Sequence, residues 1–348
     1  MQTIIARMRD GIDEEEIRRG GEILKRGGLV AFPTETVYGL GGNALDAEAS
    51  AKIYAAKGRP SDNPLIVHIA DWEAIVPLVT EIPPAAKQLA DAFWPGPLTM
   101  ILKKSDLVPE ETTGGLQTVA IRMPGDEVAR ALIRAGGGYV AAPSANTSGR
   151  PSPTKASHVE EDLGGVIDMI IDGGEVAIGL ESTIVDLTGE VPVILRPGYV
   201  NQEMLDAVLG HVEIDRGLIA EDSNVHPKAP GMKYRHYAPK AELIIVEGSG
   251  ERVRAKINAL VQEQMAAGKK AGVIGTEESL LYYKAGDVRS IGTRKDERTI
   301  AQHLFSILRE FDDSDISVIY SEAFDTPKMG QAIMNRLLKA AGHQVIQV

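Results

Sequence analysis

Two cations stand one residue apart in a loop rich in glycine and proline, within the segment KGRPSDNPL. The ammonium of Lys57 can act as a mobile point charge on phosphate, and the planar guanidinium of Arg59 can make two parallel contacts with one anion. The amide of Asn63 can both donate and accept a hydrogen bond. These residue types indicate a site for a phosphate-bearing ligand, although cations also favour the C-terminal end of a helix for structural reasons alone.

Small hydroxyl and amide side chains follow a short apolar strand in the segment AAPSANTSGRPS. Ser144, Asn146 and Ser152 are expected in a loop at the end of that strand, which is where α/β folds place ligands. Small side chains let backbone N–H groups approach an anion closely. An ordinary turn built from serine, asparagine and glycine is the structural alternative.

An arginine ends an otherwise apolar strand in the segment TVAIRMP. Because side chains alternate along a strand, Thr118, Ala120 and Arg122 share one face. Burying an arginine is costly unless it meets an anion, which here is either a substrate carboxylate or a structural Asp or Glu. The segments EST at 181–183 and RPG at 196–198 also place polar groups at strand ends.

Several familiar kinds of site are absent from the sequence. There is no cysteine, which excludes disulfides, cysteine nucleophiles and cysteine-bound zinc or iron–sulfur clusters. The segment GLGGNA at 39–44 fits a dinucleotide-binding pattern, but PTET separates it from the preceding strand and its helix opens only at Asp46. We find no phosphate loop of the G-x-x-x-x-G-K-[ST] type, no metal-binding spacing of histidines and no nucleophile elbow.

The 348 residues exceed one ordinary core, so two domains are expected. Over 1–216, apolar strands alternate with helices, such as one predicted over 47–57 with Asp46 as its N-cap, which predicts a twisted mixed sheet covered by helices. The stretch 217–240 has three prolines and no hydrophobic period, as a linker would. Over 241–348 the alternation is more regular and predicts a small, Rossmann-like, doubly wound α/β domain.

The formal charge of −12 lies in the first part of the chain, because residues 1–210 hold 18 Lys and Arg against 30 Asp and Glu. An acidic chain is not a general nucleic-acid binder, so cations for ATP or RNA must be concentrated locally. No apolar run approaches the ~20 residues that span a bilayer, and acidic residues occupy the place of a signal peptide's apolar stretch. We expect a cytoplasmic protein without a membrane segment.

Taken together, the segments resemble the YrdC-type threonylcarbamoyl-AMP synthases in their longer two-domain form. The matching stretches are FPTETVYGL, KGRPSDNPLIVH, WPGPLT, TVAIRMP, APSANTSGRPSPT, GLESTIVD, LRPG and APGMKYRHYAP. The resemblance implies a nucleotidyltransferase that converts L-threonine, bicarbonate or CO2, and ATP into L-threonylcarbamoyl-adenylate and pyrophosphate. It also implies Mg2+ held by the ATP phosphates rather than by the protein, and a concave cavity in the first domain. Downstream proteins would transfer the threonylcarbamoyl group to adenosine 37 of tRNA, with direct contact between this chain and tRNA left open.

The resemblance further assigns roles to residues. L-Threonine would be held by Thr36, His68, Arg122, Ser182 and the backbone of Ala142, with Arg122 on its carboxylate. ATP would be held by Lys57, Arg59, Asn63, Thr118, Ser144, Asn146, Ser152, Arg196, Tyr234 and Tyr237. Lys57 and Arg59 would stabilise charge, without a general base, because the attacking carbamate oxygen is already anionic. The two tyrosines belong to the 217–240 segment, which would close as a lid and keep water from a labile anhydride.

Two other readings remain open at this point. A relative in hydrogenase maturation makes carbamoyl-adenylate, but those chains carry cysteine-rich zinc modules that this sequence lacks. An RNA-binding module without catalysis is the second, and the net charge and the lack of aromatic stacking motifs argue against it. His68 alone, in PLIVHI, is also compatible with a purely structural role.

Overall fold

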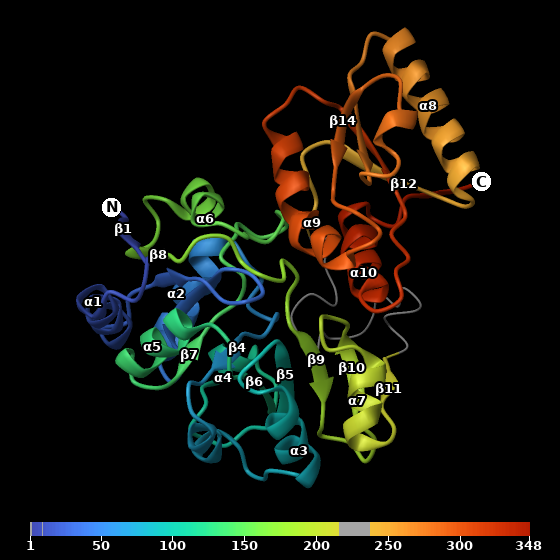
Figure 1. Ribbon diagram of the computed structural model, residues 1–348. Coiled ribbons are helices and arrows are strands. Elements are labelled where there is room, and N and C mark those ends of the chain that lie inside the picture. The colour runs from blue at the N-terminus through green and yellow to red at the C-terminus, as the bar shows by residue number, and fades with distance from the viewer. Residues whose placement is uncertain (1, 9, 216–236) are drawn as a thin grey trace. The chain divides into compact units, whose positions relative to one another are not determined.

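The computed structural model describes residues 2–8, 10–215 and 237–348 (Figure 1). The chain forms two compact units. The first contains Met1–Ser148, Ser152–Ala177 and Glu181–Tyr234, and the second contains Gly149–Pro151, Ile178–Leu180 and Arg235–Val348. Most of the predicted linker, 217–236, lies outside the described residues. The domain boundaries 1–216, 217–240 and 241–348 therefore stay a prediction.

The first unit is built on a mixed sheet of eleven strands, in the order β1-β8-β2-β3-β7-β4-β6-β5-β9-β10-β11. Parallel pairs such as β4–β6 and β5–β9 alternate with antiparallel pairs such as β5–β6 and β9–β10. This confirms the expectation of a mixed sheet. The strands are β1 Ile4–Arg7, β2 Val30–Phe32, β3 Gly39–Asn43, β4 Ile66–His68, β5 Leu98–Lys103, β6 Thr118–Arg122, β7 Val140–Ala141, β8 Met169–Asp172, β9 Thr183–Asp186, β10 Val193–Arg196 and β11 Glu213–Ile214.

Helices cover this sheet through two separate apolar cores. The larger core joins the sheet to α2, α3, α6 and α7, and the smaller core joins it to α1 and α5. A third, small cluster of Ile66, Ile101, Ala120, Ile184 and Leu195 lies on the face where the candidate site is found. The helices are α1 Glu14–Lys25, α2 Ala47–Lys57, η1 Trp72–Leu78, α3 Pro84–Phe93, α4 Glu110–Thr113, α5 Glu127–Ala135, α6 Ala156–Leu163 and α7 Gln202–Leu209.

The helix expected over 47–57 is confirmed, and its ends are set by the residues that the sequence indicated. The Asp46 carboxylate accepts a hydrogen bond from the Glu48 amide at 2.9 Å, which satisfies one of the free N–H groups of the first turn. Gly58 ends the helix in the left-handed conformation, with φ of 61°. Lys57 is therefore fixed in the last turn, directly before the loop that carries Arg59 and Asn63.

The glycine-rich segment after PTET is a strand, which the sequence did not predict. β3 pairs with β2 and β7, and four of its five residues are buried. A Cβ on Gly41 would lie 2.8 Å from Val140 Cγ1 and 2.9 Å from Phe32 Cε1, so a side chain there would collide with both neighbouring strands. The glycines permit close strand packing, and no helix follows them at once as a dinucleotide site requires.

The second unit contains a five-stranded sheet, in the order β14-β13-β15-β12-β16, in which every pair is parallel. Its strands are β12 Glu242–Glu247, β13 Ala271–Gly275, β14 Asp287–Ser290, β15 Val318–Glu322 and β16 Val345–Gln347, and its helices are α8 Gly250–Ala266, η3 Leu280–Tyr282, α9 Glu297–Asp312 and α10 Gly330–Ala340.

Helices flank both faces of this second sheet (Figure 1). Val253, Ile257 and Val261 of α8 pack on one face. Gly272 faces the opposite way, because a Cβ there would lie 2.6 Å from Phe311 of α9. The predicted doubly wound α/β domain is confirmed. None of the helices in the described part of the chain is long and apolar enough to cross a membrane.

Candidate active site

The site residues gather where four neighbouring strands of the first sheet end side by side. His68 on β4 stands opposite Arg122 on β6, and Thr99 on β5 stands opposite Arg122 from the other side. Ser182 immediately precedes β9, the next strand, and its hydroxyl lies 2.7 Å from the Thr99 hydroxyl. Strand register thus brings together residues that lie more than a hundred positions apart in the sequence.

Arg122 is buried, with 4% of its surface exposed, and it is surrounded by oxygen acceptors. Its Nη1 donates to Thr36 Oγ1 at 2.9 Å and its Nη2 to Glu35 Oε1 at 2.7 Å. Burial alone would raise the pKa of Glu35, but Arg122 and the backbone amides of Glu35 and Gly125 together outweigh it and hold that pKa below its usual value. The sequence left the anionic partner of Arg122 open, and in this structure it is a glutamate, which was not among the predicted site residues.

A local turn holds Thr36 in place beneath Arg122. The Thr34 hydroxyl accepts hydrogen bonds from the amides of Thr36 and Val37, at 3.1 Å and 3.3 Å, and lies 2.8 Å from the Thr36 hydroxyl. Short hydroxyl side chains are well suited to such turns. The PTET segment is therefore a rigid connection between β2 and β3 that points Glu35 and Thr36 at one guanidinium.

His68 is buried and neutral. Burial, together with repulsion from Arg122, lowers the pKa of His68 to about 3. Its Nδ1 lies 3.0 Å from the carbonyl oxygen of Ile66, and its ring meets that of Phe32 edge to face. A neutral imidazole beside Arg122 contributes a hydrogen-bonding group without adding positive charge.

Arg196 reaches the same face because of an irregularity in β10. Ile194 stands opposite Val185 and Arg196 opposite Ile184, so Leu195 is an extra residue in the register with β9. The Arg196 Nη2 donates to Ser182 Oγ at 3.2 Å, and its Nε donates to the Ser182 carbonyl at 3.0 Å. Ser182 consequently links Arg196 to Thr99 and thereby to the Arg122 position.

Lys57 connects the end of α2 to the loop after β7. Its ammonium donates to the carbonyl oxygens of Ser144 and Asn146. The Ser144 hydroxyl donates to Asn146 Oδ1 at 2.6 Å, and Ser144 pairs with Gly39 of β3. The two sequence motifs KGR and SAN therefore form one structural unit.

Arg59 and Asn63 form the opposite side of the KGRPSDNP loop. The Arg59 Nε donates to the Asn63 carbonyl and its Nη2 to the Pro64 carbonyl, each at 3.1 Å. Asn63 is 2% exposed, and its Oδ1 has no hydrogen-bond partner among the described residues. Burial raises the pKa of the nearby Tyr54 hydroxyl to about 12, so that hydroxyl stays protonated.

Three further predicted residues differ in their setting. Ser152 is fully buried and donates to Glu181 Oε1 at 2.5 Å, one residue before Ser182. The Ala142 amide donates to the Ile66 carbonyl at 2.9 Å, next to His68. Glu35, Thr36, His68 and Ser182 lie around Arg122 and form what we call the Arg122 cluster. Thr118 pairs with Lys103 at the far end of β6 from Arg122, so it does not belong to this cluster.

The two predicted lid tyrosines both belong to the 217–240 segment. Tyr234 lies outside the described residues. Tyr237 is 5% exposed and belongs to the second unit, where its ring packs on Phe305 with 4.9 Å between ring centroids. Its place in an ATP site stays a prediction.

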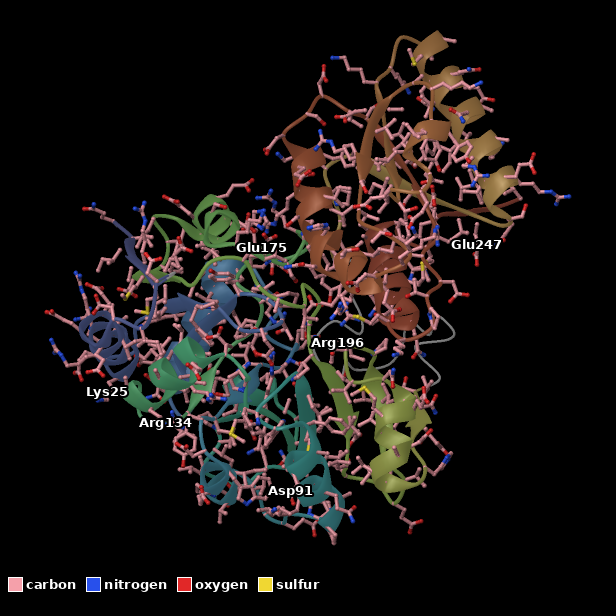
Figure 2. All side chains as sticks on the ribbon, in the orientation of Figure 1. Lys25, Asp91, Arg134, Glu175, Arg196 and Glu247 are labelled. Carbon is pink, nitrogen blue, oxygen red and sulfur yellow. The ribbon has the colours of Figure 1, made fainter. Side chains whose placement is uncertain are left out.

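Three cations of the site are buried, unlike ordinary surface cations, whereas Arg59 is partly exposed. Lys57, Arg122 and Arg196 are 2%, 4% and 5% exposed. By contrast, the side chains of Lys25 and Arg134 are 50% and 53% exposed and point outward from α1 and α5, whereas Arg196 lies at the end of β10 (Figure 2). Desolvated cations interact with anions more strongly than exposed ones, so this arrangement suits a polyanionic ligand.

The hydrogen-bonding groups of the site are mainly cationic or neutral. Over residues 2–8, 10–215 and 237–348, no group of three or more His, Asp or Glu side chains is arranged to hold a metal ion. The site instead offers ammonium, guanidinium, hydroxyl and amide groups, which are donors suited to phosphate and carboxylate oxygens.

Comparisons with known proteins agree with this geometry. A family described as "Telomere recombination" matches residues 22–198, and one described as "Threonylcarbamoyl-AMP synthase, C-terminal domain" matches residues 200–342. The chain is 50% identical to a threonylcarbamoyl-AMP synthase of Pyrococcus abyssi, over 99% of this chain and 100% of the relative. It is also 50% identical to one of Bacillus subtilis, over 96% and 95% respectively.

A solved structure gives the same result for the fold. The crystal structure of P. abyssi Sua5 complexed with L-threonine matches with a TM-score of 0.95 at 50% identity, covering 99% of this chain and 100% of that one. The chain therefore belongs to the threonylcarbamoyl-AMP synthase family, in its two-domain form. Membership makes it an ATP-using enzyme of the AMP-transferring class and confirms the resemblance seen in the sequence.

Proposed function

We propose that this chain is an L-threonylcarbamoyladenylate synthase, which makes threonylcarbamoyl-AMP and pyrophosphate from L-threonine, bicarbonate or CO2, and ATP. The observation that carries the proposal is the convergence of buried cations and hydroxyls at adjoining strand ends and loops, in a chain whose full-length relatives bear the name threonylcarbamoyl-AMP synthase. The product, threonylcarbamoyl-AMP, is the intermediate for threonylcarbamoylation of adenosine 37 in tRNA.

L-Threonine binds at the Arg122 cluster. Arg122 takes the carboxylate, because it is the buried guanidinium among the residues proposed for threonine. Thr36, His68, Ser182 and the Ala142 backbone complete the site. The complex of P. abyssi Sua5 with L-threonine supports a threonine site in this family.

ATP binds along the cationic loops. Lys57 and Arg59 neutralise phosphate charge, Ser144, Asn146 and Ser152 supply donors from the loop after β7, and Arg196 closes the site from β10. Asn63 is a candidate contact because its buried Oδ1 lacks a donor among the described residues. Thr118, Tyr234 and Tyr237 complete the proposed ATP set, and the 217–240 segment acts as its lid.

The reaction needs positioning and charge neutralisation rather than a protein base. Threonine's ammonium first loses a proton to solvent, and the free amine adds to CO2 with release of a second proton. The carbamate oxygen then attacks the α-phosphorus while the bond from that phosphorus to the pyrophosphate oxygen breaks. The nucleophile is already anionic, so the main barrier is bringing two anions together. Buried Lys57, Arg122 and Arg196 lower that barrier, because their charges are held in place before substrate arrives.

Mg2+ carried by the ATP phosphates fits a site whose own groups are mainly cations and neutral donors, and it would further neutralise the leaving pyrophosphate.

We also propose a cytoplasmic location, since both threonine and tRNA are available there. Proteins that transfer the threonylcarbamoyl group act downstream. Direct contact between this chain and tRNA is tested by the experiment below. The domain assignment is 1–216 for catalysis, 217–240 for the lid and 241–348 for an accessory domain.

The function is tested by incubating the chain with ATP, Mg2+, bicarbonate and L-threonine, and by following pyrophosphate and the adenylate product. Release should require all of threonine, bicarbonate and ATP. Turnover of carbamoyl phosphate in place of threonine and bicarbonate would favour the hydrogenase-maturation type of chemistry. Salt-dependent tRNA binding without any ATP turnover would favour an RNA-binding module instead.

Lys57 gives the first variant for this assay. We expect Lys57→Met to lower kcat/KM for ATP at least about 100-fold, because a buried charge near the phosphates is lost. Lys52→Met is the matched control, since Lys52 lies on the same helix and donates to the Gly27 carbonyl at 2.8 Å. Equal activity of the two variants would contradict a role for Lys57 in binding ATP.

A further inference from the structure

Glu35 is a largely buried carboxylate with one oxygen in an ion pair and the other without a hydrogen-bond partner among the described residues. Its side chain is 15% exposed, and its Oε1 forms the 2.7 Å ion pair with Arg122 Nη2. Its Oε2 is shielded from solvent and forms no hydrogen bond with any residue in the described part of the chain. The pair thus uses half of the acceptor capacity of the carboxylate.

A buried acceptor without a donor costs free energy, so Oε2 calls for a hydrogen-bond partner beyond the described residues. The group remains ionised, because Arg122 and the nearby amides of Glu35 and Gly125 hold its pKa below the usual value despite burial. Gly125 also packs close, since a Cβ there would lie 3.5 Å from the Glu35 Cδ. The missing partner must therefore be a hydrogen-bond donor, and a cationic one is preferred.

We propose that Glu35 binds the amino nitrogen of L-threonine, accepting its N–H through Oε2 while Arg122 binds the carboxylate. This inference rests on the proposed function and deepens it. An α-amino acid carries its ammonium and its carboxylate on one carbon, so both charges lie within a few ångströms. A carboxylate and a guanidinium in direct contact are the electrostatic complement of that pair.

The same contact serves the next chemical state. When the amine has captured CO2, the carbamate nitrogen retains one N–H, which Oε2 can still accept. Holding this N–H fixes the plane of the carbamate, and with it the direction of the oxygen that attacks ATP. Neutral His68, on the strand beside Arg122, presents no competing cation to Glu35.

The alternative is that Glu35 is only a positioning residue, which holds Arg122 and touches no substrate. Glu35→Gln separates the two roles, because its amide oxygen can still accept from Arg122 while its NH2 replaces the acceptor at the Oε2 position. Glu35→Ala removes both contacts. Glu127→Gln, an exposed residue in the first turn of α5, is the matched control.

Threonine affinity of the full-length chain is measured by calorimetry without ATP, for the wild type and the three variants. We expect Glu35→Gln and Glu35→Ala both to weaken threonine binding by about 10- to 100-fold, and Glu127→Gln to leave it unchanged. ATP affinity and the unfolding temperature report whether each variant is folded. 3-Hydroxybutyrate is threonine without its amino group. It should inhibit pyrophosphate release by the wild type and by Glu35→Gln with the same inhibition constant.

Two results would overturn the assignment. If Glu35→Gln binds threonine within threefold of wild type, Glu35 acts only through Arg122 or not at all. If Glu35→Gln weakens 3-hydroxybutyrate as much as threonine, the lost contact does not involve the amino group. Failure of the proposed function is a different outcome, because the wild type itself would then bind no threonine and release no pyrophosphate.

Discussion

At the scale of single residues, the site is a set of buried charges whose partners are oxygen atoms of the protein. The sequence indicated that Arg122 needed an anion, because an arginine at the end of an apolar strand is costly to bury alone. It did not indicate which anion, since Glu35 lies 87 positions away and meets Arg122 only through the fold. Residue type and strand position therefore predicted Arg122, whereas its partner depended on tertiary structure.

His68 gives a pH prediction at this scale. Its folded-state pKa of about 3 lies below the unfolded value of ~6.5, so the stability it contributes is present above pH ~6.5 and is lost as pH falls toward 3. Between pH 7 and 5, the free energy of unfolding of the wild type should fall by about 2 kcal/mol relative to His68→Gln. Urea unfolding at both pH values measures this, with exposed His211→Gln as the control. A constant difference between wild type and His68→Gln would contradict a buried neutral imidazole.

At the scale of elements, helices and strands with strong patterns were predicted closely, and weakly patterned ones were not. α2 begins and ends at the predicted residues, because Asp46 and Gly58 supply its caps. β3 was missed because its sequence, GLGGN, has few side chains and so no hydrophobic period. Val166, in an apolar sequence before β8, is 50% exposed, and β8 begins only at Met169. Local pattern does not reveal which apolar residues the neighbouring elements will cover.

Gly41 gives a prediction for β3. A methyl group there would lie 2.8 Å from Val140 Cγ1 and 3.2 Å from the Val30 carbonyl oxygen, with strands on both sides that leave little room to move. Gly41→Ala should lower the free energy of unfolding by about 2 kcal/mol, the usual cost of overpacking. In exposed Gly189, the nearest atom to a Cβ is 3.7 Å away, so Gly189→Ala should change stability by less than about 0.5 kcal/mol. Equal chemical-denaturation midpoints for the two variants would show that β3 tolerates side chains.

At the scale of the whole molecule, composition and alternation predicted the architecture well. Length indicated two domains, and the described residues form two compact units. A mixed sheet and a doubly wound parallel sheet were both expected, and both are present. The net charge of −12 predicted that functional cations would be concentrated locally, and Lys57, Arg122 and Arg196 are buried. Strand order and register could not be predicted, since they depend on contacts between distant segments.

The predicted boundary at residue 241 can be tested with a fragment. All five strands and all three α-helices of the parallel sheet domain fall within 242–347, with an apolar core of their own. We expect residues 241–348 alone to unfold cooperatively in urea, followed by circular dichroism. A fragment that stops at 329 lacks α10 and β16 and should show no such transition, because its sheet loses a strand and a covering helix. A gradual, non-cooperative loss of the circular dichroism signal from 241–348 would contradict a domain boundary at residue 241.

The extra residue in β10 has a consequence for how related chains are aligned. With strict alternation, consecutive residues such as Leu195 and Arg196 would face opposite sides of the sheet. The irregularity lets Leu195 join the apolar cluster with Ile184 while Arg196 still reaches the Ser182 hydroxyl. A one-residue deletion at this point would leave the composition almost untouched and yet turn the guanidinium away from the other strand ends. We therefore expect a gap of one residue before the RPG motif to change the direction of this guanidinium as well as the length of the strand.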